Sequence, residues 1–82
     1  MSHVARIRTF LKTNLESREH PTNVDCGYQI VIGRTGEVLL QLATFGSDQR
    51  KSPPKVSQTI QLDRDAAAAL VDILRSTFAG IR

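Results

Sequence analysis

The residue types that most often carry chemistry are sparse in this chain, and their spacing fits no common motif. His3, His20 and Cys26 are its only histidines and its only cysteine. Their spacing matches no paired zinc-ligand pattern, so we expect no metal site. Two surface histidines and a small thiol explain these residues without a ligand.

Phosphate-binding and nucleophilic motifs are equally weak. The segment Gly33–Gly36 lacks the Gly-Lys-Ser/Thr ending of a phosphate loop, and it precedes an expected strand instead of a helix, so a hairpin turn explains it better. Asp63 and Asp65 are accounted for by a helix N-cap and a first-turn acid. Ser47 and Ser52 have no histidine nearby in sequence to activate them. The sequence therefore predicts neither an enzyme nor a cofactor.

Basic residues gather in one short interval. Arg50, Lys51 and Lys55 occur with no acid between them, in a chain of net charge +3 and pI near 9.6. Such cations can neutralise phosphates and release counterions, and Tyr28 or Phe45 could stack on unpaired bases. Simple solubility of a solvated loop explains the same charges about equally well.

The basic interval lies between segments that are typical of strands. Residues 28–32 are rich in β-branched and aromatic types, turn chemistry follows at 33–36, and a second apolar run follows that turn. Gly, Ser, Asp and two prolines in 46–54 indicate an exposed loop, and 56–62 alternates apolar with polar residues. We predict a hairpin over about 27–45 and a strand over about 56–62, in a small antiparallel sheet of three to four strands.

Two helices are expected to flank this sheet. Asp63 is a strong N-cap candidate, good helix formers follow over about 64–78, and Gly80 suits the position after the helix end. An earlier set of apolar residues recurs at spacings of three and four, which predicts an amphipathic N-terminal helix: Val4, Ile7, Leu11 and Leu15. The fold class is α+β, with residues 1–82 forming a single domain.

The second strand of the hairpin is apolar on both faces. Val38, Leu40 and Leu42 alternate with Leu39, and Ala43 and Phe45 continue the second face. Either the two helices cover opposite faces, or they share one face and a second copy of the chain buries the other. We therefore expect a homodimer.

The chain carries no sign of a membrane or secretory segment. No apolar run approaches the roughly 20 residues that span a bilayer, and the basic N-terminus is not followed by a long apolar stretch. A single cysteine cannot form an internal disulfide. A cytoplasmic location is the expectation.

The order of elements resembles that of a known family of single-stranded DNA-binding proteins, the family of the transcriptional coactivator positive cofactor four. The similarity covers residues 28–78 and is carried by Gly36–Leu42, by Pro54-Lys55 closing the basic loop, and by Ile60–Asp63 leading into the helix. It implies a curved antiparallel sheet backed by a helix, a homodimer and a groove for unpaired nucleic acid. It also implies which residues contact the nucleic acid. Phe45 would stack on a base, and four cations would contact phosphates: Arg34, Arg50, Lys51 and Lys55.

Two hypotheses for function follow. The first is a non-enzymatic protein that binds single-stranded DNA or RNA through its basic loop, in transcription or DNA metabolism. The alternative is a protein-interaction or accessory module, a small α+β dimer with no nucleic-acid role, in which the two-faced strand and the first helix dock another chain.

Overall fold

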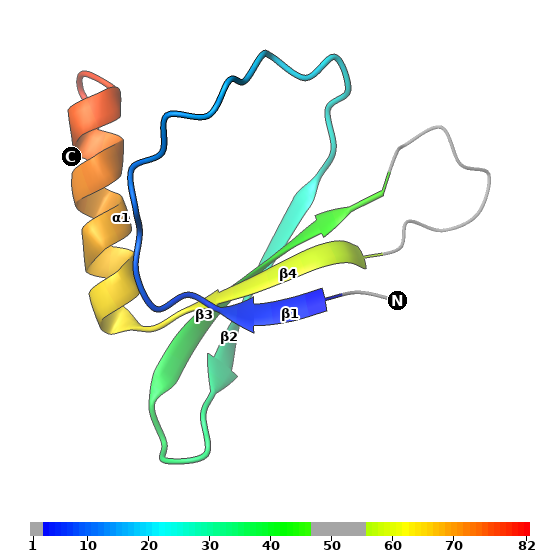
Figure 1. The fold of residues 1–82 in the computed structure, drawn as a ribbon. Coiled ribbons are helices and arrows are strands. Elements are labelled where there is room, and N and C mark those ends of the chain that lie inside the picture. Colours follow the sequence, from blue (N-terminus) through cyan, green and yellow to red (C-terminus); the bar gives the residue numbers. More distant parts are fainter. Residues whose placement is uncertain (1–2, 47–55) are drawn as a thin grey trace.

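The computed structural model describes residues 3–46 and 56–82, which form one sheet and one helix (Figure 1). The strands lie in the order β1-β4-β3-β2, where β2 and β4 each pair antiparallel with β3 and β1 pairs parallel with β4. The sheet is therefore mixed, and not purely antiparallel as predicted. The element bounds are β1 (His3–Arg6), β2 (Cys26–Ile32), β3 (Val38–Phe45), β4 (Val56–Leu62) and α1 (Arg64–Thr77).

The predicted hairpin is confirmed, and it is closed by a glycine turn. The Gly33 amide donates to the Glu37 carbonyl at 2.7 Å, and the Gly36 amide donates to the Gly33 carbonyl at 3.0 Å. Gly36 has a φ of +85°, a conformation that costs glycine little because it has no Cβ. The predicted strand at 56–62 and the C-terminal helix are also confirmed.

The predicted N-terminal helix is wrong. Val4 lies in β1, and the Ile7 amide donates to the Gln61 carbonyl at 2.9 Å, so the start of the segment extends the sheet. Residues 7–25 contain no helix or strand, and Leu11 and Leu15 are exposed. The physical reason is the open edge of β4, whose backbone groups need partners and take them from β1. Apolar residues at helical spacing do not stabilise a helix when no apolar surface packs against them.

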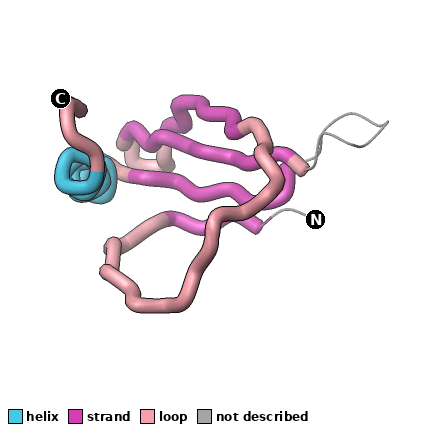
Figure 2. The backbone as a smooth tube through the Cα atoms, turned by 90° about the horizontal axis from the view of Figure 1, so that it is seen from above, coloured by secondary structure: helices cyan, strands magenta, loops and turns pink. Residues whose placement is uncertain are grey.

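Helix α1 starts where β4 ends, and it is well capped. The Asp63 carboxylate accepts a hydrogen bond from the Ala66 amide at 2.8 Å, and the Phe78 amide donates to the Leu74 carbonyl at 2.9 Å. In both views the helix lies at one end of the sheet, and it approaches chiefly the strand that it follows (Figures 1 and 2). The helix therefore does not cover a face of the sheet.

Few side chains of the described residues are buried. Leu39, Leu62 and Ala66 are the buried apolar residues, and Thr59 is the buried polar one. The rest of the helix stripe, Leu70 and the residues after it, is half-buried or exposed. The hydrophobic core thus sits at the junction of the sheet with the first turn of α1.

A cluster of ion pairs links β1 to the junction between the sheet and α1. The Arg6 guanidinium donates to both carboxylate oxygens of Glu37 at 2.9 Å and to Asp63 at 3.3 Å. These hydrogen bonds raise the pKa of Arg6. The pKa of Asp63 is lowered, first by the Ala66 amide and then by Arg6. One side chain of β1 thereby holds the end of the hairpin and the helix cap together.

Replacing Asp63 with alanine should lower the melting temperature by about 5 °C at pH 7, because the helix loses its cap and Arg6 loses a partner. Since folding lowers the pKa of Asp63, its stabilisation is present above its usual pKa of 3.8 and is lost as the pH falls through the folded value. The difference in melting temperature between wild type and variant should therefore narrow as the pH falls below 3.8. Thermal unfolding followed by circular dichroism measures both effects.

The matched control is Asp72→Ala, which removes an exposed acid from the middle of the same helix. It should leave the melting temperature within a degree or two of wild type, since exposed sites contribute little. An equal gap for Asp63→Ala at pH 7 and at pH 2.5 would contradict the assigned titration.

Candidate nucleic-acid interface

One face of the sheet carries a row of glutamines. Gln29 pairs with Gln41 across β2 and β3, and Gln41 pairs with Gln61 across β3 and β4. Because directly paired residues project to the same face, the three side chains form one line across the strands. Within that line, the Gln61 amide nitrogen donates to the Gln41 amide oxygen at 2.9 Å. We call this side of the sheet the glutamine face.

A shallow hollow of about 440 Å³ lies on the glutamine face, toward the end of the sheet where β3 finishes. All four strands contribute to it. Its lining combines amide, hydroxyl and aromatic groups, as is typical of surfaces that bind partly polar ligands. The lining consists of Val4, Gly27, Tyr28, Gln29, Gln41, Ala43, Phe45 and Thr59.

Phe45 closes this hollow by lying against the backbone of Gly27. A Cβ added at Gly27 would come within 3.3 Å of the ring atoms Cε2 and Cζ of Phe45. The pairing register shifts between Thr44 and Phe45, an irregularity that re-aims side chains at the end of a strand. The ring is half-buried, so part of it remains accessible. Gly27 is not among the residues predicted for the site, although a glycine inside a strand pattern signals close approach of this kind.

The basic residues Arg50, Lys51 and Lys55 lie outside the described residues. Their place in the chain is nevertheless informative, because β3 ends at Phe45 and β4 begins at Val56. The segment that carries the three cations therefore joins the sheet at the same end as Phe45 and the hollow.

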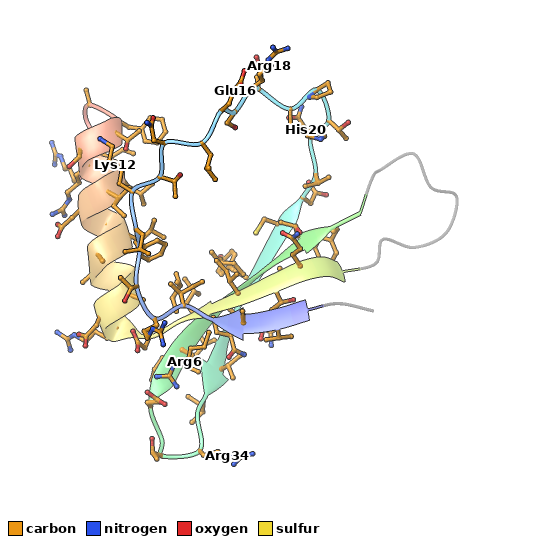
Figure 3. The ribbon with its side chains drawn as sticks, in the orientation of Figure 1. Arg6, Lys12, Glu16, Arg18, His20 and Arg34 are labelled. Atoms are coloured by element: carbon orange, nitrogen blue, oxygen red, sulfur yellow. The ribbon has the colours of Figure 1, made fainter. Side chains whose placement is uncertain are left out.

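Arg34 lies at the other end of the sheet. It is exposed in the turn between β2 and β3, at the tip of the hairpin (Figure 3). Strand β3 is eight residues long and runs from this turn to Phe45 at its other end, a span of roughly 25 Å. The structure thus does not bring Arg34 together with Phe45, and a ligand that touches both must run along the strands.

Tyr28 and Phe45 belong to opposite faces. Tyr28 pairs with Leu42, whereas the glutamine face takes the alternate residues of β3, including Gln41 and Ala43. The two rings therefore cannot stack on the same stretch of nucleic acid. Both aromatic residues considered from the sequence line the hollow, but by register only the side chain of Phe45 belongs to the glutamine face.

The described part of the chain holds no cluster of three or more His, Cys, Asp or Glu side chains that could bind a metal ion. His20 accepts a hydrogen bond from the Thr22 amide at 3.1 Å, and Cys26 is exposed at the start of β2. The helix in this part of the chain is too short and too polar to cross a membrane.

Comparison with known proteins gives no match, whether to a protein-family model, to a curated protein or to a solved structure. The glutamine face and the Phe45 ring, at the end of the sheet where the chain leaves β3, are therefore the features that bear on function.

Proposed function

We propose that this protein binds single-stranded nucleic acid on its glutamine face, without catalysing a reaction. The observation that carries the proposal is the hollow between the glutamine row and the accessible ring of Phe45, at the end of the sheet where the basic loop joins. Aromatic rings, amides and cations are the groups that stack on bases, hydrogen-bond their edges and neutralise phosphates, respectively.

The glutamines suit bases because a side-chain amide both donates and accepts hydrogen bonds. Gln29 is exposed, and in the Gln61–Gln41 hydrogen bond the Gln41 nitrogen and the Gln61 oxygen take no part. Unpaired bases present donors and acceptors on their edges and can turn them toward such a row. A duplex hides most of these edges, so we expect single strands to bind more tightly.

The direction of the strands suggests the path of the ligand. A nucleic acid that begins at the basic loop and stacks on Phe45 can follow β3 toward Arg34, over roughly 25 Å. For comparison, one OB-fold domain, another small β-sheet module, occupies about 4–16 nucleotides. Arg34 would then contact a phosphate at the far end of a short oligonucleotide.

Fluorescence anisotropy with a labelled single strand and the matching duplex, each at two salt concentrations, tests the proposal. Changing Arg50, Lys51 and Lys55 together to alanine should weaken single-strand binding about tenfold and reduce the slope of log affinity against log salt by about 2. The control changes Arg64, Arg75 and Arg82 to alanine, which alters the net charge equally at exposed positions on and after α1.

The control should keep most of the affinity, because its cations lie on the helix and tail and not at the hollow. Equal losses in the two triple variants would mean that only net charge matters. A wild-type protein with no affinity for single strands at low salt would end the proposal.

The opposite side of the sheet favours a second function, a protein-interaction module. Tyr28, Ile30 and Ile32 of β2 are all exposed there, which is typical of docking surfaces. If the anisotropy titrations are flat, this second function becomes the better explanation of the fold.

A further inference from the structure

The outer edge of β2 is open in the described part of the chain. β2 is the last strand of the sheet, and among the described residues only β3 pairs with it. That pairing runs from Cys26 to Ile32 without a register shift, so β2 has no bulge that would turn its outer edge away from a partner. An edge of this kind presents a row of unpaired backbone donors and acceptors.

Two hydrogen bonds show which residues of β2 point to this edge. The Phe45 amide donates to the Asp25 carbonyl at 3.0 Å, and the Gly33 amide donates to the Glu37 carbonyl at 2.7 Å. In an antiparallel ladder, residues that bond to the neighbouring strand alternate with residues whose backbone groups point away from it. The odd-numbered residues of β2 therefore bond to β3. The backbone groups that point to the open edge belong to the even-numbered residues Cys26, Tyr28, Ile30 and Ile32.

Three of these four residues also carry exposed apolar side chains, at 79% for Tyr28, 70% for Ile30 and 62% for Ile32. By register they begin three cross-strand rows, which we call the apolar rows: Tyr28–Leu42–Ile60, Ile30–Leu40–Leu62 and Ile32–Val38. The middle row becomes buried toward β4, where Leu62 is 2% exposed. The next row along the sheet carries the polar residues Thr44 and Gln58. The exposed ends of the apolar rows therefore lie on β2, beside its outward backbone groups.

Strand β2 lacks the features that protect an edge strand from pairing. Natural edges are protected by shortness, by charged side chains, by proline or by a bulge. At the opposite edge of the sheet, β1 is only four residues long and ends in Arg6. β2 is seven residues long and contains no charged residue and no proline. Its edge is therefore suited to pairing with another strand.

We propose that an extended segment of another protein pairs with β2 as an additional strand of the sheet. Backbone donors and acceptors in a row are matched by the backbone of an extended chain. Alternate side chains of this segment would continue the apolar rows and should be apolar, whereas those between them would lie beside Gln29 and should be polar. This inference gives the protein-interaction function its partner and does not depend on nucleic-acid binding.

Charges at the two ends of β2 define the direction of the partner. Asp25 precedes the strand and Arg34 follows it in the turn, and both are exposed. Neither forms an ion pair with another described residue. Antiparallel pairing is the more stable arrangement per residue. The partner strand then begins beside Arg34, where an acidic residue fits, and ends beside Asp25, where a basic residue fits.

A peptide capped at both ends, with the sequence Glu-Val-Thr-Val-Thr-Val-Thr-Thr-Lys, meets these requirements and serves as the probe. Its three valines would lie opposite Ile32, Ile30 and Tyr28. Amide hydrogen exchange followed by nuclear magnetic resonance reports the contact residue by residue. At ten times its dissociation constant the peptide should slow exchange of these three amides about tenfold. The odd-numbered residues between them already bond to β3, so their exchange should change little.

Methylation of single peptide amides provides the matched control. The amide of the valine opposite Ile30 faces β2, whereas the amide of the threonine opposite Gln29 faces solvent. Methylation of that valine should weaken binding at least about tenfold, because the Ile30 carbonyl loses its donor. Methylation of the threonine should leave the affinity within about twofold of the parent peptide, since that amide makes no bond to β2. Anisotropy of fluorescently labelled peptides measures both affinities.

The same contrast is available in the protein at Ile30. Ile30→Pro removes the outward amide, and Ile30→Thr keeps it while losing the same apolar side chain. Proline is tolerated at an edge position whose amide does not bond to the neighbouring strand, so the hairpin should still form. Ile30→Pro should bind the peptide at least about tenfold more weakly than Ile30→Thr does. Circular dichroism checks that both variants fold.

Four results would overturn the proposal. The first is a peptide that leaves the exchange of the three amides unchanged at millimolar concentration. The second is an equal effect of the two methylated peptides, which would mean that the peptide does not pair as a strand. The third is a folded Ile30→Pro protein that binds as tightly as Ile30→Thr. The fourth is slow exchange of these amides without peptide: at every protein concentration it means that the chain covers its own edge, and only at high concentration it means that a second copy does.

Discussion

Replacing Leu62 with alanine is expected to lower the free energy of unfolding by about 2–5 kcal/mol, the range measured for large-to-small changes in protein cores. Leu62 is the most deeply buried large side chain in the described part of the chain, at 2% exposure. It pairs with Leu40 on the neighbouring strand β3, and it is the last residue of β4, one residue before the N-cap of α1. Its removal leaves a cavity at the junction on which both sheet and helix depend. Urea unfolding at a fixed protein concentration measures the loss.

The control for this change is Leu15→Ala. Leu15 is 81% exposed in the connection 7–25, so its replacement should alter the free energy of unfolding by no more than about 0.5 kcal/mol. The comparison also tests whether the connection 7–25 is exposed in solution and not packed as a helix. If Leu15→Ala destabilised the protein as much as Leu62→Ala, the segment would be packed in solution and the description of the core would be wrong.

Replacing Phe45 with alanine is expected to weaken single-strand binding by roughly 10- to 100-fold. Stacking of a base on an aromatic ring contributes about 1–3 kcal/mol, and by register Phe45 is the aromatic residue of the hollow whose side chain belongs to the glutamine face. Stacking releases no counterions, so the affinity should fall by the same factor at every salt concentration. The basic-loop variant should instead change the salt dependence. Anisotropy titrations at several salt concentrations distinguish the two effects.

Phe78→Ala is the matched control, because it removes the same ring from the C-terminal end of α1, where Phe78 is exposed. It should bind oligonucleotides as wild type does. Unchanged affinity in a folded Phe45→Ala protein would remove stacking from the proposed mechanism. The contribution of Arg50, Lys51 and Lys55 to binding would still be measured by the salt titration of their triple-alanine variant.

Local chemistry was sufficient to predict the second half of the fold. The glycines at 33 and 36 specify a turn, the alternation at 56–62 specifies a strand, and Asp63 specifies a helix start; the structure has all three. Each signal acts between residues close in sequence, through backbone conformation, side-chain direction or a capping hydrogen bond. Such signals do not depend on what the rest of the chain does.

The first 25 residues and the composition of the site depended on distant contacts. Val4 and Ile7 fit a helical pattern, yet this segment pairs as a parallel strand with the edge of β4. That pairing places Arg6 where it forms ion pairs with Glu37 and Asp63. Pairing between residues more than fifty positions apart leaves no periodic mark in either segment. Likewise, only the register shows that Tyr28 and Phe45 lie on opposite faces.

The sequence by itself determined that this protein has a hairpin, a further strand, a capped helix and a strand too apolar to be solvated on both sides, and that three cations cluster between Arg50 and Lys55. Tertiary structure alone decided which side chains share each face of the sheet. Pairing of β2, β3 and β4 gathers the glutamines and Phe45 on one face and the apolar rows on the other. The reason is that a strand alternates its side chains between two faces, but only the register with its neighbours decides which residues share one.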